Sequence, residues 1–241
     1  HRSIRKFRSE PIAPEVLQDM LEAASRASTC GNMQLYSLIV TQSRELREAL
    51  APCHFNQPMV TQAPCVITVC ADVHRFSMWC EQRDAEPCYD NFAWFLNGVT
   101  DALLAAQNLC VEAEAHGLGI CYLGTTIYTA EEIARILDLP KGVIPVTTIV
   151  VGHPDESPEL TDRLPLDAVV HCEKYHHYTS SEIDELWAEK ETSEETRRLL
   201  EENGLPNLAQ IFTRNRYRAE DNLAISRNYF ALLKKQGFFN N

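Results

Sequence analysis

Several features that define other protein classes are missing from this sequence of 241 residues. It has no long uncharged apolar run, so we predict no membrane-spanning segment, and we expect no signal peptide. Its nine cysteines include no C-x-x-C pair, and Cys65, Cys70, Cys110 and Cys121 lie in apolar stretches. This usage is typical of small buried side chains in a reducing compartment, and we therefore expect a cytoplasmic protein.

The common catalytic signatures are also absent. No G-K-[ST] follows a glycine-rich loop and no G-x-G-x-x-G opens a helix, which excludes a P-loop and that dinucleotide fingerprint. There is no G-x-S-x-G elbow and no H-E-x-x-H. Residues 171–177 carry three histidines, a cysteine and a glutamate, but their spacing matches no familiar zinc pattern. We therefore predict no metal site.

Positive charge is scarce, with 22 Lys and Arg against 34 Asp and Glu and a formal net charge of −12. This excess repels nucleic acid and anionic lipid, so we predict neither as a partner. The segment HRSIRKF at 1–7 is nevertheless basic. An arginine fork can bind a phosphate through two hydrogen bonds, so Arg2 and Arg5 could flank one phosphate while Ser3 donates between them. A solvated basic segment is the alternative interpretation.

Apolar patterns of helical and of strand period alternate along the chain. Helices are predicted over 11–28, 43–50, 91–117, 129–139, 180–202 and 219–239. Strands are predicted over 35–42, 63–72, 119–124 and 143–154. This interleaving indicates an α+β or α/β fold around one mixed sheet.

Three of the predicted helices have distinctive patterns. Segment 91–117 has apolar residues at helical spacing over about six turns, and the width of this apolar face predicts a central helix or a subunit interface. Segment 129–139 is predicted to open with a capping box of Thr129 and Glu132. Segment 180–202 is strongly acidic and is interpreted as a solvated helical face.

The sequence ASTCGNMQ at 27–34 concentrates polar groups between two apolar elements. Ser28, Thr29, Asn32 and Gln34 supply donors and acceptors that could line a pocket for a polar heteroaromatic ring. A turn rich in Ser, Gly and Asn explains the same residues equally well.

Glycines surround the predicted strand at 119–124. Gly117, Gly119 and Gly124 could allow a backbone to approach a ligand, and Gly124 with Thr125 could offer an N–H group to a cofactor. A helix stop followed by a tight turn is the alternative. Further along, Arg163 lies alone in the loop TDRLPL, where it is interpreted as a surface charge unless it converges with the basic segment 1–7.

Taken in order, these pieces resemble the nitroreductase family of FMN-dependent oxidoreductases. HRSIRKF resembles the family's opening R-x-S-x-R-x-F motif, GNMQ its N-x-Q, and GLGICYLG its G-L-G-x₄-G stretch. The segment GHPDESPELTDRLPLDAVVHCEKY resembles the branch of oxygen-insensitive nitroreductases and NADPH–flavin oxidoreductases, which also ends in a helical tail. The likeness extends over nearly the whole chain.

The resemblance implies an α+β homodimer with a three-layer fold, in which helices flank a mixed, mainly antiparallel sheet. It implies an FMN-binding core at 1–180, and a helical extension at 181–241 that packs on the core or on the partner subunit. FMN would bind at the dimer interface without a covalent link, with NADPH or NADH as the reductant. The cofactor-binding residues carried over are His1, Arg2, Ser3, Arg5, Ser28, Thr29, Asn32, Gln34, Gln57, Leu123, Gly124, Thr125 and Arg163.

Two positions depart from the branch pattern. Thr161 stands where the branch often has a lysine, and Thr125 stands where it tends to have a second glycine. The implied reaction is a ping-pong, two-electron reduction of a small-molecule acceptor such as a nitroaromatic, a quinone or free flavin, and it requires no catalytic side chain. The alternatives are an FMN-binding protein without turnover, acting as a sensor or store, or another reductive activity on the same scaffold.

Overall fold

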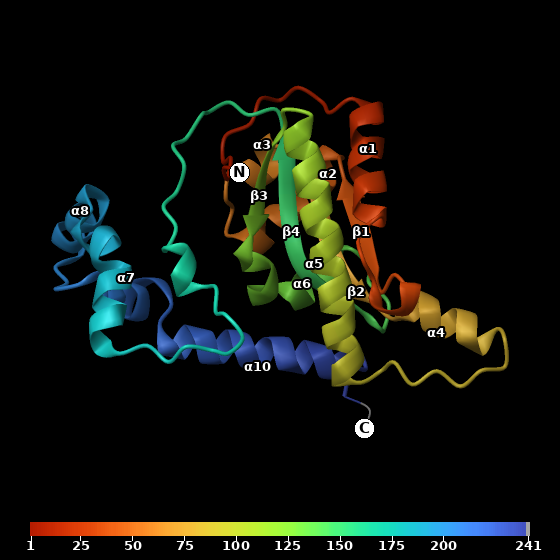
Figure 1. The fold of residues 1–241 in the computed structure, drawn as a ribbon. Coiled ribbons are helices and arrows are strands. Elements are labelled where there is room, and N and C mark those ends of the chain that lie inside the picture. Colours follow the sequence, from red (N-terminus) through yellow and green to blue (C-terminus); the bar gives the residue numbers. More distant parts are fainter. Residues whose placement is uncertain (240–241) are drawn as a thin grey trace. The chain divides into compact units, whose positions relative to one another are not determined.

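The computed structural model describes residues 1–239 and is built around one four-stranded sheet. The strands stand in the order β1 (Tyr36–Thr41), β2 (Cys65–Asp72), β4 (Val143–Gly152) and β3 (Gly119–Leu123), as Figure 1 shows. All three neighbouring pairs are antiparallel. The one parallel pairing among residues 1–239 is an isolated bridge between Ser3 and Ile120. The predicted α+β fold with a mainly antiparallel sheet is confirmed.

The chain forms two compact units. The first comprises His1–Glu159 and the chain from Ile225 onward, and the second comprises Leu160–Ala224. The helices of the first unit are α1 (Pro14–Ser25), α2 (Arg44–Leu50), α3 (Met59–Gln62), α4 (His74–Glu81), α5 (Phe92–Ala115) and α6 (Ala130–Ile136). The second unit holds α7 (Ser180–Thr192), α8 (Glu194–Asn203) and α9 (Leu208–Ile211), and α10 (Ala219–Lys235) begins there and ends in the first unit. None of these helices is long and apolar enough to cross a membrane.

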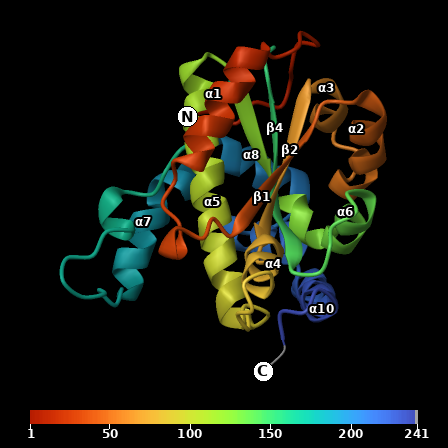
Figure 2. The same cartoon turned by 90° about the vertical axis from the view of Figure 1, so that its right-hand side faces the viewer.

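The two faces of the sheet carry different layers. Since successive strand residues point to opposite faces, Ile67 and Ile149 join the apolar cluster beneath α1 and α5, whereas Val66 and Val150 join a cluster with α3 and the N-terminal segment. Figure 2 shows α1 and α5 on one side of the sheet, and α2, α3 and α6 on the other. All eight residues of β2 are buried, which confirms the prediction that this strand is covered on both faces.

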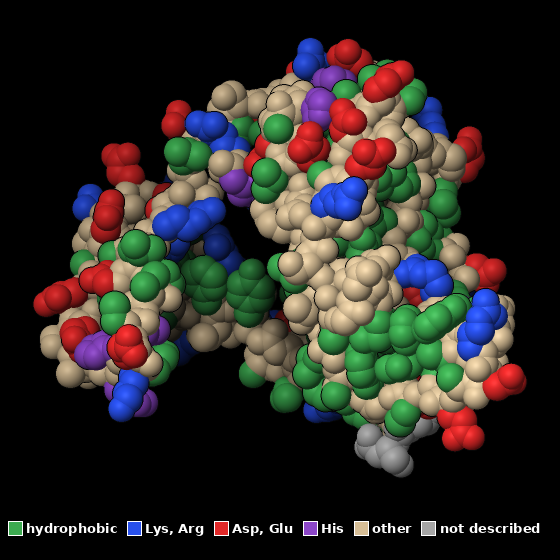
Figure 3. All heavy atoms as spheres, turned by 45° about the vertical axis from the view of Figure 1, so that its right-hand side comes forward, with side chains coloured by type: hydrophobic (Ala, Val, Ile, Leu, Met, Phe, Trp, Pro, Cys, Tyr) green, Lys and Arg blue, Asp and Glu red, His purple; other side chains and the backbone are tan. Residues whose placement is uncertain are grey.

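Helix α5 crosses the whole sheet and confirms the prediction of a central helix. Asn91 caps its start by accepting a hydrogen bond from the Trp94 N–H, and Gly117 follows its end with a left-handed φ of 74°. One side of α5 packs on the sheet, but Leu96 and Val111 on its other side are 48% and 56% exposed. Figure 3 shows exposed apolar side chains gathered in the lower part of the first unit, above the grey atoms. The subunit-interface alternative stays a prediction.

The helix starts show where the sequence patterns were misleading. The predicted capping box at Thr129 is wrong, because the Thr129 hydroxyl donates to the Cys53 carbonyl at 2.7 Å and makes no cap contact within α6. A capping box forms instead at the start of α7, between Thr179 and Glu182. Helix α4 was not predicted; it is a short helix of eight residues in which Cys80 is the one buried residue.

Candidate functional site

The basic N-terminal segment is held against β3 by its apolar residues. Ile4 and Phe7 are buried, and the Ile4 N–H donates to the Ile120 carbonyl at 2.9 Å. The carboxylate of Glu156 accepts the backbone N–H groups of Arg5 and Lys6. The apolar positions of the motif therefore fix its backbone, and its arginine side chains remain on the surface.

Glycine is required where this segment meets the sheet. A Cβ atom on Gly119 would lie 2.5 Å from the Ile4 side chain, and one on Gly152 would lie 3.2 Å from Phe7 and closer still to Pro64. Gly119 thus permits the approach of the N-terminal segment, not of a ligand. Gly124 is different, because a Cβ atom there would meet nothing within 4 Å. A Cβ atom on Gly117 would also meet nothing within 4 Å, but Gly117 has a positive φ, which itself favours glycine. Gly124 has no positive φ, so neither its backbone conformation nor a neighbouring atom requires a glycine there.

The two arginines of the motif keep their binding capacity. Within residues 1–239, the guanidinium groups of Arg2 and Arg5 form no hydrogen bond and no ion pair, and both residues are exposed. His1 instead uses its Nδ1 atom to contact the Glu114 carboxylate at 2.6 Å. Arg2 and Arg5 are therefore free to bind an anion, which is the chemistry that the motif predicts.

A strained loop carries Gln57. It runs from the 3₁₀ turn η2 (Ala51–His54) to α3, and Phe55 and Asn56 both adopt left-handed φ angles of 54° and 53°. Such conformations are costly for non-glycine residues and cluster at functional sites. The side-chain oxygen Oε1 of Gln57 is buried and has no hydrogen-bond partner among the described residues. A buried acceptor of this kind is expected to find a partner, and a bound ligand could supply one.

The third segment, Leu123–Thr125, ends β3 and begins the 3₁₀ turn η3 (Gly124–Tyr128). Leu123 shares one apolar cluster with Ile4 of the N-terminal segment and Met59 of α3. This cluster brings the N-terminal motif, the Gln57 loop and the end of β3 to the same face of the sheet. These are three of the segments from which the sequence predicts a single site.

The polar loop at 28–34 lies elsewhere. Asp101 of α5 is only 1% exposed, and its carboxylate accepts the backbone N–H groups of Cys30 and Leu35 at 2.9 and 3.0 Å. The loop is thereby tied to the helix that covers the opposite face of the sheet. Within one chain, the structure does not bring Ser28, Thr29, Asn32 or Gln34 to the cluster of the other three segments. The Gln34 amide donates to Asn32, so these two side chains partly satisfy each other.

Arg163 belongs to the second compact unit. Its guanidinium group donates to the Thr161 hydroxyl at 2.6 Å and to the Asp162 carbonyl at 2.8 Å. Thr161, which stands in place of the branch's lysine, thus holds the Arg163 side chain to its own loop. The convergence of Arg163 with Arg2 and Arg5 stays a prediction.

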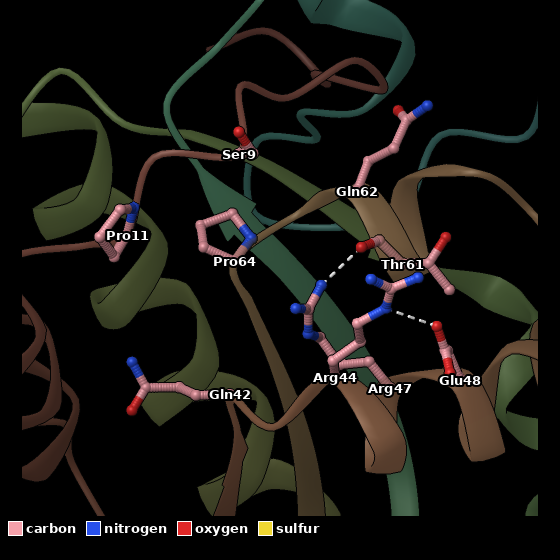
Figure 4. A pocket seen from close by; sticks show the side chains of 9 residues that line it. All are labelled: Ser9, Pro11, Gln42, Arg44, Arg47, Glu48, Thr61, Gln62 and Pro64. Carbon is pink, nitrogen blue, oxygen red and sulfur yellow. Dashed lines mark hydrogen bonds and ion pairs between the residues drawn. The ribbon is translucent and has the colours of Figure 1, made fainter.

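A separate hollow of about 550 Å³ lies between α2 and the segments that flank it. Figure 4 shows its two arginines, but both are already engaged: Arg44 pairs with Glu48 at 2.7 Å, and Arg47 donates to the carbonyls of Thr61 and Ala63. None of the predicted cofactor residues lines this hollow. We interpret Arg47 as a structural residue that links α2 to the chain at Thr61 and Ala63. No group of three or more His, Cys, Asp or Glu side chains within residues 1–239 could hold a metal ion.

Known proteins are similar to this chain both in sequence and in fold. The family model of the nitroreductase family matches residues 1–153. An NADPH-dependent oxidoreductase from Staphylococcus aureus is 36% identical over 180 residues, which cover 73% of this chain and 71% of the relative. The chain belongs to the nitroreductase family. The prediction of an oxidoreductase of this family is confirmed.

Solved structures of nitroreductase-family relatives extend the match over the full chain. One solved structure is that of an inferred oxidoreductase from Bacteroides fragilis. It is 49% identical to this chain with a TM-score of 0.98, and the match covers 100% of this chain and 98% of the relative. The NADPH:FMN oxidoreductase of Vibrio harveyi, solved in complex with NAD⁺, is 27% identical with a TM-score of 0.82, covering 100% of this chain and 96% of its own. The predicted branch is therefore confirmed as well.

Sequence reasoning missed three residues that organise the segments described above. Glu156 fixes the backbone of the N-terminal motif, Asp101 fixes the polar loop, and His54 contacts Thr125. Each acts on a segment more than 60 residues away in the sequence, so no local pattern signals its role. The only available signal was the presence of a charged or polar residue within an otherwise apolar stretch, as for Asp101 in α5.

Proposed function

We propose that this chain is an FMN-dependent NAD(P)H oxidoreductase that transfers two electrons to a small-molecule acceptor in a ping-pong reaction. Two of its relatives support the proposal: the Staphylococcus aureus protein is an NADPH-dependent oxidoreductase, and the Vibrio harveyi protein is an NADPH:FMN oxidoreductase. The nitroreductase family generally uses FMN, which agrees with the motifs on this chain.

The observation that carries the proposal is the pair of unpartnered guanidinium groups, Arg2 and Arg5, on a backbone fixed beside Ile120, near the start of β3. A phosphate needs such donors. Two further features fit the rest of FMN: the open space beside Gly124 suits a flat ring lying on the backbone, and the buried Oε1 atom of Gln57 lacks a hydrogen-bond donor. The residues present therefore fit the cofactor.

The proposed roles are those that the family resemblance implies. Arg2, Ser3 and Arg5 would hold the phosphate and the ribityl chain, with His1 beside them, and Arg163 would complete the phosphate site. Leu123, Gly124 and Thr125 would lie along the ring, and Gln57 would meet its edge. When bound, FMN would supply the two-electron redox chemistry between the nicotinamide and the acceptor. The protein would bind and orient the reactants.

The position of the 28–34 loop supports a homodimer. One chain holds Ser28, Thr29, Asn32 and Gln34 on the α5 side of its sheet, away from the other three segments. We propose that a second copy supplies this loop to the cofactor, so that FMN lies at the interface and each site uses residues 1–180 of both chains. The exposed apolar side of α5 is consistent with such an interface.

NADPH is the proposed reductant, and nitroaromatics, quinones and free flavin are the proposed acceptors. The test is an absorbance spectrum of the purified protein, followed by titration with NADPH and with NADH without air. A yellow protein that bleaches with NADPH, and regains its colour on addition of a nitroaromatic or a quinone, supports the reductase. A yellow protein that neither nucleotide bleaches supports the FMN-binding alternative. A colourless protein that binds no added FMN contradicts both.

A further inference from the structure

His54 joins two of the segments that form the proposed cofactor site. It is fully buried at the end of η2, and its Nδ1 atom lies 2.8 Å from the Thr125 hydroxyl oxygen in η3. A second bond runs beside it, from the Thr129 hydroxyl to the carbonyl of Cys53. One hydrogen bond therefore links η2 to η3, and an adjacent one links η2 to Thr129, the residue that follows η3, although the partners are more than 70 residues apart in the sequence.

The same histidine anchors the strained loop. The Gln57 N–H donates to the His54 carbonyl at 3.1 Å, and the Asn56 N–H donates to the Ala51 carbonyl at 2.9 Å. These bonds hold Phe55 and Asn56 in their left-handed conformations. The backbone of His54 thus supports the loop that presents Gln57, while its ring supports the turn that begins with Gly124.

Space filling alone does not explain a histidine at this position. The Nε2 atom is buried and has no hydrogen-bond partner among the described residues. Leaving a buried polar atom unpaired is unfavourable, and an apolar side chain of similar size would avoid that cost. Burial also lowers the pKa of His54 to about 4, so the ring is neutral near pH 7 and is not poised to exchange protons there. What remains for the ring to do is to hold Thr125.

We propose that His54 is a positioning residue of the flavin site: its Nδ1 bond to Thr125 fixes the Gly124–Thr125 backbone relative to the Gln57 loop, so that both segments meet the ring in one arrangement. The inference rests on the proposed FMN-dependent function. It also explains the departure at Thr125, where the family branch tends to have glycine. In this chain, the threonine hydroxyl is the partner that His54 requires.

The test compares variants that keep or remove the bond between His54 and Thr125. His54→Gln places an amide near the position of Nε2 and loses the bond to Thr125, whereas His54→Asn places an amide near Nδ1 and can keep it. Thr125→Val removes the hydroxyl but preserves its shape. His116→Gln is the control, because His116 is a partly exposed histidine that pairs with Asp19 and Glu112 away from this site. Each apoprotein is titrated with FMN, and the midpoint potential of the bound flavin is measured.

We expect His54→Gln and Thr125→Val each to raise the FMN dissociation constant about three- to tenfold, which corresponds to the loss of one net hydrogen bond. Both should shift the midpoint potential in the same direction. The double variant should be no worse than either single variant, because the two residues act through one bond. His54→Asn should stay within about twofold of the wild type, as should His116→Gln.

Two results would overturn the inference. In the first, His54→Gln and Thr125→Val both fold, as judged by their melting temperatures, and both bind FMN with the affinity and the midpoint potential of the wild type. The other is a double variant whose losses are the sum of the two single losses. Should His54→Gln not fold, Thr125→Val and the His54→Asn comparison still decide the question. If the wild-type protein itself binds no FMN, the proposed function fails first, and that result is distinct from both outcomes above.

Discussion

Replacing Arg5 with alanine should remove the proposed phosphate contact without disturbing the fold. The Arg5 backbone is held by the Glu156 carboxylate, and the neighbouring Ile4 is held by its bond to Ile120. The Arg5 guanidinium group forms no hydrogen bond and no ion pair within residues 1–239. Removing it should therefore leave the free energy of unfolding nearly unchanged, while it removes one of the two unpaired arginines of the N-terminal motif.

The expected magnitude follows from the kind of bond that is lost. A hydrogen bond to a charged group contributes about 1.5–3 kcal/mol, and about 1.4 kcal/mol corresponds to a factor of ten in affinity. Because Arg5 is exposed, the lower end of this range applies, and the FMN dissociation constant should rise about tenfold. Arg5→Lys should lie between the wild type and Arg5→Ala, since lysine keeps the charge but loses the planar fork.

Flavin fluorescence during titration of the apoprotein measures this change. Arg8→Ala is the matched control, because Arg8 lies in the same segment, outside the motif, and its guanidinium group forms a single long ion pair within residues 1–239, with Glu10 at 3.9 Å. The Arg5→Ala effect should also shrink as the salt concentration rises. If Arg5→Ala binds FMN as tightly as the wild type and the Arg8 control do, Arg5 does not contact the phosphate and the reasoning from the motif is wrong.

Three further predictions concern other parts of the site. Gly124→Val should fold normally, because the new side chain meets open space, but it should abolish FMN binding. A purified valine variant that is still yellow would show that no flavin ring lies at Gly124. Asp101→Asn should lower the free energy of unfolding in urea by about 1–3 kcal/mol, because one of two backbone N–H groups loses its acceptor; unchanged stability would refute the role of this carboxylate. As the pH falls from 6.5 to 4, the free energy of unfolding of the wild type should decrease by on the order of 3 kcal/mol, because His54 binds a proton in the unfolded chain that the folded form excludes. Urea titrations at each pH measure this change, and His54→Gln should lack this part of the pH dependence.

Local patterns were sufficient to predict most of the fold. The apolar run of β2 and the helical spacing in α5 reflect burial against the sheet, which is a property of neighbouring residues in the sequence. The order of the strands could not be derived in this way. It depends on which strands pair over long sequence distances, as β2 does with β4. Helix α4 was not predicted; it is only eight residues long and Cys80 is its one buried residue.

Local patterns predicted even fewer of the contacts that hold the candidate site together. The motif at 1–7 could be interpreted as a phosphate-binding segment because its charges are adjacent in the sequence. The capping box predicted at Thr129 failed because the hydroxyl found a partner 76 residues away, in Cys53. The contacts of His54 with Thr125 and of Asp101 with Cys30 each span 71 residues. Such pairings exist only in the folded chain, and they determine how the site is held together.

A crystal structure of the full chain grown with FMN tests the central claim most directly. We expect the phosphate to lie against the guanidinium groups of Arg2 and Arg5, and the flat ring to lie on the backbone of Gly124 with one face open. Density for FMN in another place, or none at saturating FMN while Arg2 and Arg5 point into solvent, would contradict the account.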